Sequence, residues 1–409
     1  MIVNTPTKKS LRLILLACLF TGFFLICPFF LSMTIAQEWS GYVGVEGRLF
    51  FADPLHPDQR DQNGSLVAQP EFFHQWDEYS VTAVPFFRFD SADAERSHFD
   101  IRELFVLWVP ESFELGFGFR KIFWGVTESQ HLLDIINQTD LVELPDGEEK
   151  LGQPMINLSV LRDWGMVDLF LLPYFRERTF PGPKGRLRGA LVVDTDQARF
   201  ESGAENHHFD IAARYSLTLD NWDLALSHFQ GTGREPTLLP GTDTAGNTVL
   251  IPFYEQIDQS GLALQSVIDA WLLKLELIHR RGQGEAFEAW TSGIEYTYSA
   301  LVGSKADLGI IAEWLHDTRG EKATTPFEDD MMIGLRLALN DMDSTEFLVG
   351  LIQDLDHSAR VLSLEANRRF GDRWLMSIEG SVFSAQSQGE LLYAQRDDDF
   401  MHVSLSYYF

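Results

Sequence analysis

Cysteine is almost absent from this sequence. Only Cys18 and Cys27 occur among 409 residues, and both lie in the first apolar segment. Once that segment is removed, disulfides and thiolate metal sites are excluded. Basic residues are also scarce, because 32 Lys and Arg stand against 60 Asp and Glu, a formal net charge of −28. Such an acidic surface repels nucleic acid, which excludes that class of partner.

Only one long apolar run occurs, and it covers 13–31 near the start of the chain. Three basic residues precede the run, namely Lys8, Lys9 and Arg12. Thr34 and Ala36 supply small residues before a cleavage point, so 1–36 is predicted to be a secretory signal peptide. Two alternatives stay open: a retained membrane anchor, since the run is long enough to span a bilayer, and a lipoprotein box at Cys18.

Residues 37–409 show no Pro- or Ser-rich linker, no low-complexity tract and no change of composition. We therefore expect one domain over 37–409. Cleavage would remove three basic residues and no acidic ones, leaving 29 Lys and Arg against 60 Asp and Glu. The formal charge of the mature chain would be −31.

Apolar stripes with a 3.6-residue period are missing from 37–409, and segments of alternating polarity take their place. In 307–317 the residues Leu308, Ile310 and Trp314 share one face, and the closing MHVSLSYYF alternates in the same way. A period of two is the side-chain period of a β-strand. The sequence therefore predicts an all-β protein.

The alternating segments are about eighteen in number. The predicted strands are 39–52, 65–75, 79–90, 98–109, 113–125, 155–163, 166–176, 207–218, 222–230, 254–267, 271–281, 286–299, 306–316, 329–340, 345–356, 358–370, 373–385 and 398–409. Short turns alternate with generally longer links between them. The long links are 53–64, 126–154, 177–206, 231–253, 317–328 and 386–397.

This sorting of links by length is typical of an outer-membrane barrel, which has tight turns on one side and long loops on the other. A bilayer offers no hydrogen bonds to the backbone, so a sheet crosses it only when closed. We predict a closed antiparallel transmembrane β-barrel of about 18 strands, with 16 as the alternative. Its outer face should be apolar and its inner face polar and filled with water.

Tryptophans support this interpretation. Five of them lie at or beside short turns, namely Trp76, Trp164, Trp222, Trp271 and Trp374. Indole rings prefer the membrane–water boundary, which predicts one aromatic girdle; core aromatics would instead be scattered along strands. The inward-facing charges should be Asp168, Arg176, Asp210, Arg214, Asp223, Lys274, Glu276, Arg280, Glu295, Asp307, Glu313, Arg336, Glu365 and Arg369. Both signs are present in similar numbers, so these residues do not indicate which ions would be selected.

Two stretches resemble a known family. The terminal strand ends on Phe409, as Gram-negative outer-membrane barrels commonly do for recognition by the assembly machinery. The stretch DIRELFVLW…FELGFGFRKIFWG is similar to porin-type barrels such as the alginate-export and phosphate-selective porins, through Arg102-Glu103 and Trp124-Gly125. Lys121 departs from that pattern, which usually has glutamine there. The motifs cover about a tenth of the mature chain and fix no substrate.

The resemblance implies a porin that passes small hydrophilic solutes, without enzymatic activity or a cofactor. The expected pore-lining or constriction residues are Arg102, Glu103, Arg120, Trp124, Asp134, Asp140, Arg214, Lys274, Glu276 and Arg336. Expected partners are outer-membrane lipid, lipopolysaccharide and the barrel-assembly machinery, with Phe409 as the assembly signal and a homotrimer as an alternative to a monomer. A transporter for a hydrophobic substrate and a non-conducting structural barrel remain rival hypotheses.

The link 126–154 is the most informative loop. Residues 128–137 are predicted to form a short helix capped by Thr127. The loop either folds into the lumen and narrows it or stays outside. If inside, four apolar residues should pack on the wall, namely Leu132, Leu133, Ile135 and Ile136. Three acidic residues should then face the water path, namely Asp134, Asp140 and Glu143.

Other loops carry weaker patterns. A basic cluster near 177–206 comprises Arg176, Arg178, Lys184, Arg186 and Arg188, which either binds anions such as lipopolysaccharide phosphates or is simply solvated. The acidic stretch 90–95 is a candidate site for a divalent ion at the rim. Its spacing, however, lacks the full liganding pattern of known calcium loops. His207-His208 is a candidate metal pair, although neighbours on a strand point to opposite faces. HExxH, GxSxG, P-loop and GxGxxG motifs are absent.

Overall fold

A computed structural model of the chain describes residues 38–409 with the exception of residue 145. Trp39–Phe409 form one compact unit, which is the folded body of the protein. The signal peptide proposed for 1–36 lies outside the described residues and stays a prediction. No helix among the described residues is long and apolar enough to cross a membrane.

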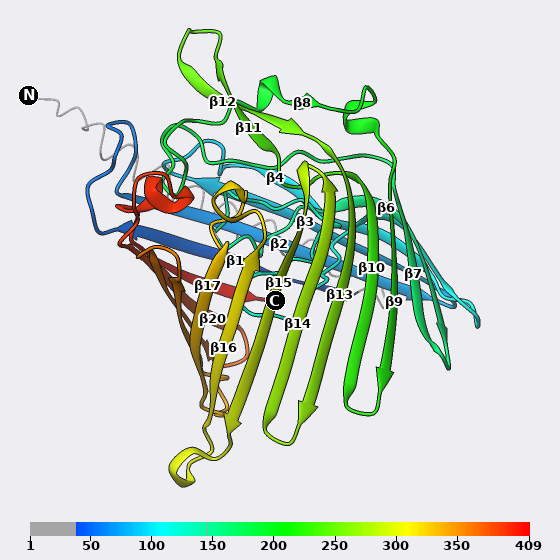
Figure 1. The fold of residues 1–409 in the computed structure, drawn as a ribbon. Coiled ribbons are helices and arrows are strands. Elements are labelled where there is room, and N and C mark those ends of the chain that lie inside the picture. Colours follow the sequence, from blue (N-terminus) through cyan, green and yellow to red (C-terminus); the bar gives the residue numbers. More distant parts are fainter. Residues whose placement is uncertain (1–37, 145) are drawn as a thin grey trace, which may run out of the picture. The chain divides into compact units, whose positions relative to one another are not determined.

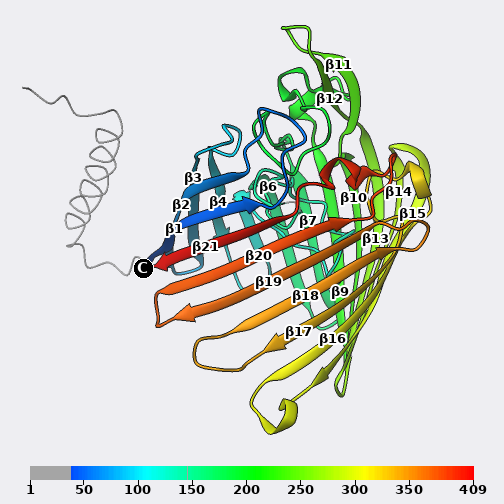
Figure 2. The same cartoon turned by 90° about the vertical axis from the view of Figure 1, so that its left-hand side faces the viewer.

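Eighteen antiparallel strands form one closed barrel (Figures 1 and 2). They are β1 (Glu38–Phe50), β2 (Gln62–Trp76), β3 (Tyr79–Asp90), β4 (Phe99–Trp108), β5 (Glu114–Arg120), β6 (Gln153–Arg162), β7 (Gly165–Leu172), β9 (Asp210–Leu219), β10 (Trp222–Thr232), β13 (Gln256–Ile268), β14 (Trp271–Gly282), β15 (Gly284–Tyr298), β16 (Asp307–Asp317), β17 (Asp329–Ala338), β18 (Glu346–Asp354), β19 (Arg360–Phe370), β20 (Trp374–Ser384) and β21 (Phe400–Tyr408). Each overlaps one predicted strand, so the predicted fold class and strand count are confirmed.

The barrel closes where the last strand meets the first. β21 pairs with β1 in a register that runs from Tyr42 opposite Tyr408 to Phe50 opposite Phe400. The backbone N–H of Phe409 donates to the carbonyl of Gly41 at 3.1 Å. Closure leaves no unpaired strand edge to be satisfied by lipid.

Two strands end four or five residues earlier than the sequence pattern predicts. β5 stops at Arg120 instead of continuing to residue 125, and β7 stops at Leu172 instead of residue 176. The residues that follow each strand leave the barrel wall. The structure also contains a three-stranded sheet within the long loops, made of β8 (Arg199–Phe200), β11 (Thr237–Thr242) and β12 (Thr248–Tyr254). The sequence pattern did not predict that sheet.

The outer face of the barrel is apolar, as predicted. Leu226, Ile294 and Leu335 are 46–50 % exposed, which is unusual for large aliphatic side chains unless lipid covers them. The five girdle tryptophans, Trp76, Trp164, Trp222, Trp271 and Trp374, are also exposed at the short-turn end. Asp77 and Asp220 adopt left-handed φ values of 46° and 53° in these tight turns. Aspartate tolerates that conformation better than most residues.

The inner face differs from the prediction in one respect. A cluster of buried apolar side chains covers the inner wall from β4 to β15, including Phe170, Phe229 and Ile278. We expected a polar inner face lined by water, and this stretch of the wall is apolar instead. The reason is that a loop of the same chain packs against this part of the wall and buries it.

Candidate functional site: the inner loop

The inner loop, residues 121–152, connects β5 to β6 and enters the barrel. Asn137 explains why β5 ends where it does. Its side-chain amide donates to the carbonyls of Arg120 and Leu151 at 2.9 and 2.8 Å, and its Oδ1 accepts the N–H of Ile122 at 2.8 Å. These bonds replace strand pairing and turn the chain inward. The hypothesis that the loop folds into the barrel is confirmed.

Two glutamates of the far wall hold the first half of the inner loop. Glu276 on β14 accepts the N–H groups of Val126, Thr127 and Leu133 at 2.7, 3.1 and 3.2 Å. Because Glu276 is fully buried, these charge-assisted bonds are strong. The carboxylate therefore satisfies backbone donors that would otherwise need partners within the loop.

Glu313 on β16 likewise binds the backbone of the next residues of the inner loop. It accepts the N–H groups of Glu128 and Ser129, each at 2.8 Å. The helix predicted for 128–137 is wrong, and the segment is irregular. The Thr127 hydroxyl lies 2.6 Å from the Gln130 carbonyl and 2.8 Å from Glu276, and it shares its one proton between these acceptors, so it does not cap a helix. Side chains of the wall take the place of helical hydrogen bonds.

Apolar contacts seat the loop on the wall. Leu133, Ile135 and Ile136 are at most 4 % exposed and belong to the apolar cluster of the inner face. A Cβ atom on Gly261 of β13 would lie 2.0 Å from Leu133, so only glycine leaves room for this contact. Trp124 packs edge-on against Phe170 with 5.6 Å between ring centroids. The apolar residues of the loop thus pack on the wall as predicted.

Buried arginines clamp the tip of the loop to the near wall. Asp140 lies 2.7 Å from Nη2 of Arg102 on β4 and accepts the hydroxyl of Thr179 at 2.6 Å. Glu143 accepts Nε of Arg88 on β3 at 2.9 Å. Asp140 is fully buried and Glu143 nearly so, so neither lines a water path. The expectation that they face water is corrected, since both neutralise wall arginines.

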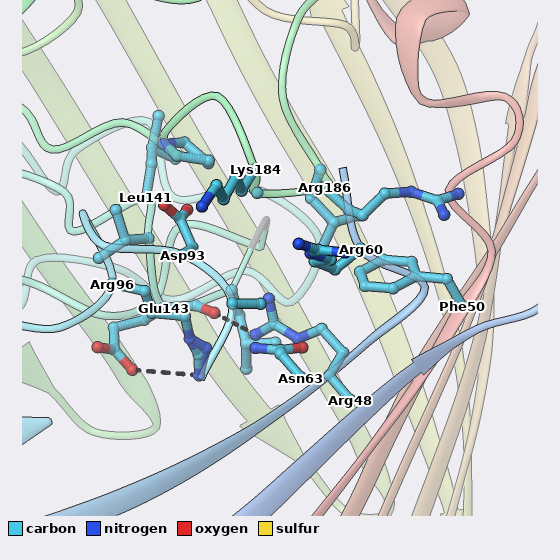
Figure 3. A pocket seen from close by; sticks show the side chains of 16 residues that line it. Arg48, Phe50, Arg60, Asn63, Asp93, Arg96, Leu141, Glu143, Lys184 and Arg186 are labelled. Atoms are coloured by element: carbon cyan, nitrogen blue, oxygen red, sulfur yellow. Dashed lines mark hydrogen bonds and ion pairs between the residues drawn. The ribbon is translucent and has the colours of Figure 1, made fainter. Parts of the chain in front are cut away.

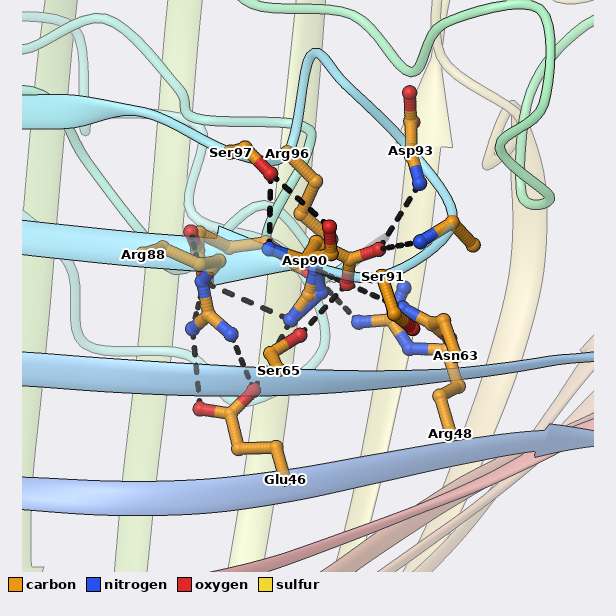
Figure 4. A network of polar contacts seen from close by, with 12 residues as sticks. Glu46, Arg48, Asn63, Ser65, Arg88, Asp90, Ser91, Asp93, Arg96 and Ser97 are labelled. Atoms are coloured by element: carbon orange, nitrogen blue, oxygen red, sulfur yellow. Dashed lines mark hydrogen bonds and ion pairs between the residues drawn. The ribbon is translucent and has the colours of Figure 1, made fainter. Parts of the chain in front are cut away.

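Figure 4 shows how this clamp extends to β1. Arg88 forms a two-pronged ion pair with Glu46, and Arg96 lies 3.2 Å from the same carboxylate. The Asp90 carboxylate accepts hydrogen bonds from the hydroxyl of Ser65 and from the side-chain amide of Asn63, each at 2.6 Å. The four strands β1 to β4 are therefore joined on their inner face by one charge network.

The acidic stretch 90–95 is part of this network. Asp90 also accepts the N–H groups of Ala92 and Asp93, and Asp93 accepts that of Gly182 at 3.0 Å. These bonds occupy the carboxylates with donors of the protein itself. His208, which lies between β8 and β9, is 2.8 Å from Asp210 through Nδ1.

The basic loop 177–206 crosses the mouth, which we define as the long-loop end of the barrel. Arg186 donates through Nε to Asp398 at 2.6 Å and through Nη2 to the carbonyl of Asp397 at 2.6 Å. Arg176 donates to Asp100 at 2.7 Å. Arg186 is nearly fully buried, so the cluster is neither simply solvated nor wholly free for anions.

A small cavity lies beneath this loop (Figure 3). Its volume is about 20 Å³, enough for one water molecule. Five cationic side chains line it, namely Arg48, Arg60, Arg96, Lys184 and Arg186. The acidic residues that line it are Asp93 and Glu143, so positive charge predominates.

The inner loop presents acidic groups to β17–β20, most of them from its second half. We call this set the acidic strip, and it comprises Glu128, Asp146, Glu148, Glu149, Glu365 and Glu379. Glu365 on β19 and Glu379 on β20 are register partners and face inward together. The pKa of Glu148 is raised to about 7, first because the surrounding barrel desolvates it and then because Asp146, Glu365 and Glu128 add negative charge.

Basic residues balance the strip only in part. Arg336 on β17 pairs with Glu128 at 2.6 Å, and Lys274 on β14 lies 3.6 Å from the same carboxylate. Lys150 in the loop pairs instead with Asp134 at 3.1 Å. The remaining five carboxylates of the strip form no ion pair among the described residues.

The structure separates the expected constriction residues into two groups. The first group has buried side chains, either in the inner loop itself or on the wall beneath it, and comprises Arg102, Trp124, Asp134, Asp140, Lys274 and Glu276. Those with partial exposure are Glu103, Arg120, Arg214 and Arg336. Arg120 lies over the ring of Phe105 and Arg214 over that of Trp124, at 4.8 and 5.4 Å. Their part in a constriction stays a prediction.

Sequence reasoning missed most of the acidic strip. Asp146, Glu148, Glu149 and Glu379 were not among the expected pore residues, although Glu365 was assigned to the inner face. The run DGEEK at 146–150 was a usable pattern, since four of its five residues are charged.

Comparison with solved structures agrees with this architecture. Wzi of Escherichia coli, described as an outer-membrane, carbohydrate-binding β-barrel involved in group 1 capsule assembly, is 10 % identical. The match covers 98 % of this chain and 89 % of Wzi, with a TM-score of 0.53. The chain has the fold of an outer-membrane β-barrel.

A second solved outer-membrane barrel, OpdQ of Pseudomonas aeruginosa, gives the same TM-score of 0.53 at 11 % identity. That match covers 92 % of this chain and 98 % of OpdQ. No protein-family model and no curated protein matches the sequence. The likeness to known barrels is thus one of fold, and it supports an outer-membrane location.

Proposed function

We propose that the barrel is a diffusion channel for small hydrophilic solutes. The observation that carries this proposal is the position of Glu365. Its neighbour Leu364 points to lipid and is 41 % exposed, so Glu365 points inward, yet Glu365 is also exposed. An exposed carboxylate on the inner face requires water in the lumen there. The water path would run between the inner loop and β17–β20.

The lining of this path sets the class of solute. Five carboxylates of the acidic strip form no ion pair with any described residue, while Arg336 pairs with the sixth, Glu128. A low-dielectric wall focuses the field of such a strip on the passage. We propose that cations and neutral hydrophilic molecules pass more readily than anions of similar size. The sequence alone left the ion selectivity open.

Planar-bilayer recording of the refolded protein tests the proposal. Wild-type protein should give steady current, and a salt gradient should give a reversal potential of the sign expected for cations. The double variant Glu365→Gln, Glu379→Gln should keep the current and lose much of the cation preference. The matched control is Glu111→Gln, an exposed carboxylate on a short turn, which should behave as wild type. Absence of current at all voltages would refute the channel.

Binding of an acidic carbohydrate at the mouth is the second candidate function. The five basic side chains lining the small cavity favour it, and Wzi shows that this fold can bind carbohydrate. It predicts no conductance, together with saturable binding of an acidic polysaccharide that Lys184→Ala weakens. The roles of lipopolysaccharide, of the assembly machinery at Phe409 and of a homotrimer remain proposals at the same level.

A further inference from the structure

A separate cluster of acidic groups lies at the mouth ends of β17 and β18. Glu328, Asp330, Asp354 and His357 line a cavity of about 250 Å³ there. One ligand atom from each of Glu328, Asp354 and His357 lies within 4.8 Å of the other two. These distances suit ligands that share one metal ion, because donors around an ion with bonds of about 2.0–2.6 Å are that close.

The charges of this cluster lack compensation. Asp330 and Asp354 are 2 % and 6 % exposed and stand directly opposite each other in the strand register. Like charges in that position repel, and burial increases the cost of both. In the part of the chain that the structure describes, no lysine or arginine pairs with Glu328, Asp330 or Asp354. His357, with Nδ1 3.4 Å from Asp354, supplies the nearest partner.

An unpartnered oxygen points independently to a ligand. Oδ2 of Asp330 is buried and has no hydrogen-bond partner. Glu390, which lines the same cavity from the loop 386–397, also has two buried carboxylate oxygens without partners. Buried polar atoms nearly always have a partner, so such a group needs a specific explanation. A bound cation would satisfy these oxygens.

A second cluster of similar composition shows the contrast. His98, Asp140 and Glu143 also come within ligand distance of one another. There, however, Arg102 lies 2.7 Å from Asp140, and Arg88 donates to Glu143 at 2.9 Å. The charges of that cluster are neutralised within the protein, so it has no need of a metal.

We propose that Glu328, Asp354 and His357 bind a divalent metal ion through two carboxylate oxygens and one imidazole nitrogen, with the buried Asp330 carboxylate beside them in the same cavity. This donor set suits ions such as Zn²⁺ and Mn²⁺, because carboxylates favour hard cations and imidazole favours transition metals. Asp354 is already oriented, since its Oδ1 accepts the N–H groups of Asp356 and His357 at 2.8 and 2.6 Å. The ion would tie β17, β18 and the turn 355–359 together at the mouth.

Titration calorimetry of the refolded, chelator-treated protein with Zn²⁺ and with Mn²⁺ tests the site. Wild-type protein should bind one equivalent of at least one of these ions. Asp354→Asn and His357→Ala should each weaken binding at least about tenfold. The matched control is Asp356→Asn, an exposed carboxylate in the same turn, which should bind as wild type. No saturable binding, or binding unchanged in both variants, would overturn the proposal.

Asp330→Asn gives a second, opposite readout. Without metal, the variant should melt at a higher temperature than wild type, because one of two opposed buried charges is gone. The increase in melting temperature on adding metal should shrink. A purely structural role for the Asp330 carboxylate predicts the reverse, a lower melting temperature of the metal-free variant. Folding is checked by heat-modifiable gel mobility, and if Asp354→Asn fails to fold, exposed His357 decides the outcome.

Discussion

Adjacent residues of one strand face different solvents in this molecule. Leu335 on β17 is 48 % exposed on the outer face, while its neighbour Arg336 points inward and pairs with Glu128 across the lumen. The change from lipid to water therefore takes place within one residue. It is the residue-scale basis for the fold and for the proposed channel.

Leu335→Arg should lower the free energy of unfolding in a bilayer by about 2–4 kcal/mol, because it places a charge among lipid chains. Arg336→Leu should lower it by less than about 1 kcal/mol, since it removes a partly exposed ion pair. Urea titration of barrels folded in vesicles measures both values. Equal losses would show that the assignment of inner and outer faces is wrong.

The proposed cation preference should depend on pH through Glu148. Its pKa is raised to about 7 by desolvation and neighbouring carboxylates, so the group is largely neutral below that pH and charged above it. The preference for cations should therefore increase as pH rises from about 6 to about 8. Reversal potentials in a salt gradient measure the change. Glu148→Gln should flatten this part of the profile, and a profile identical to wild type would contradict the assignment.

The inner loop is the element that makes the two sides of the barrel interior different. Its backbone donates hydrogen bonds to Glu276 and Glu313, which stabilise an irregular conformation. Arginines of β3 and β4 form ion pairs with its tip. The loop and the apolar wall beneath it form a packed core on one side of the barrel. The other side, along β17–β20, retains the exposed acidic lining.

Glu276→Gln should loosen the inner loop without opening the barrel. Glutamine replaces one acceptor oxygen with an NH₂ group that faces a backbone N–H, so a hydrogen bond to a charged group is lost. We expect this loss to destabilise the loop conformation by about 1.5–3 kcal/mol. The expected result is faster proteolytic cleavage within 121–152 and noisier channel current, with unchanged gel mobility of the folded barrel. Glu295→Gln is the control, because its carboxylate faces Lys274 and Arg336 instead of the loop backbone.

The strands were predictable from the sequence because lipid and water impose a period of two on each of them. The course of the loops was not. The backbone of residue 126 is satisfied by a carboxylate 150 positions away, and no local pattern encodes that contact. Trp124 continued the strand pattern of β5 even though the chain had already turned inward at Arg120. Likewise, the opposition of Asp330 and Asp354 depends on the register of β17 and β18, which periodicity leaves undetermined.

At the scale of the whole molecule, closure of the barrel determines the exterior, and packing of the inner loop determines the interior. Pairing of β1 with β21 removes the last sheet edge, which permits a lipid-covered exterior. The inner loop then packs against the side of the barrel lined by β4–β15, and the proposed water path runs along the acidic side. The net negative charge of the chain is thus present inside the barrel as well as on its rim.

The most direct test of this division is current recorded through Glu365→Cys before and after a cationic, membrane-impermeant methanethiosulfonate. Both native cysteines precede residue 37, so a processed barrel carries no other thiol. Leu364→Cys, which faces lipid, is the matched control and should show no effect on current. We predict steady current through Glu365→Cys that falls on modification, together with its cation preference. A silent barrel, or a fully modified Glu365→Cys with unchanged current, would contradict a water-filled passage beside β19.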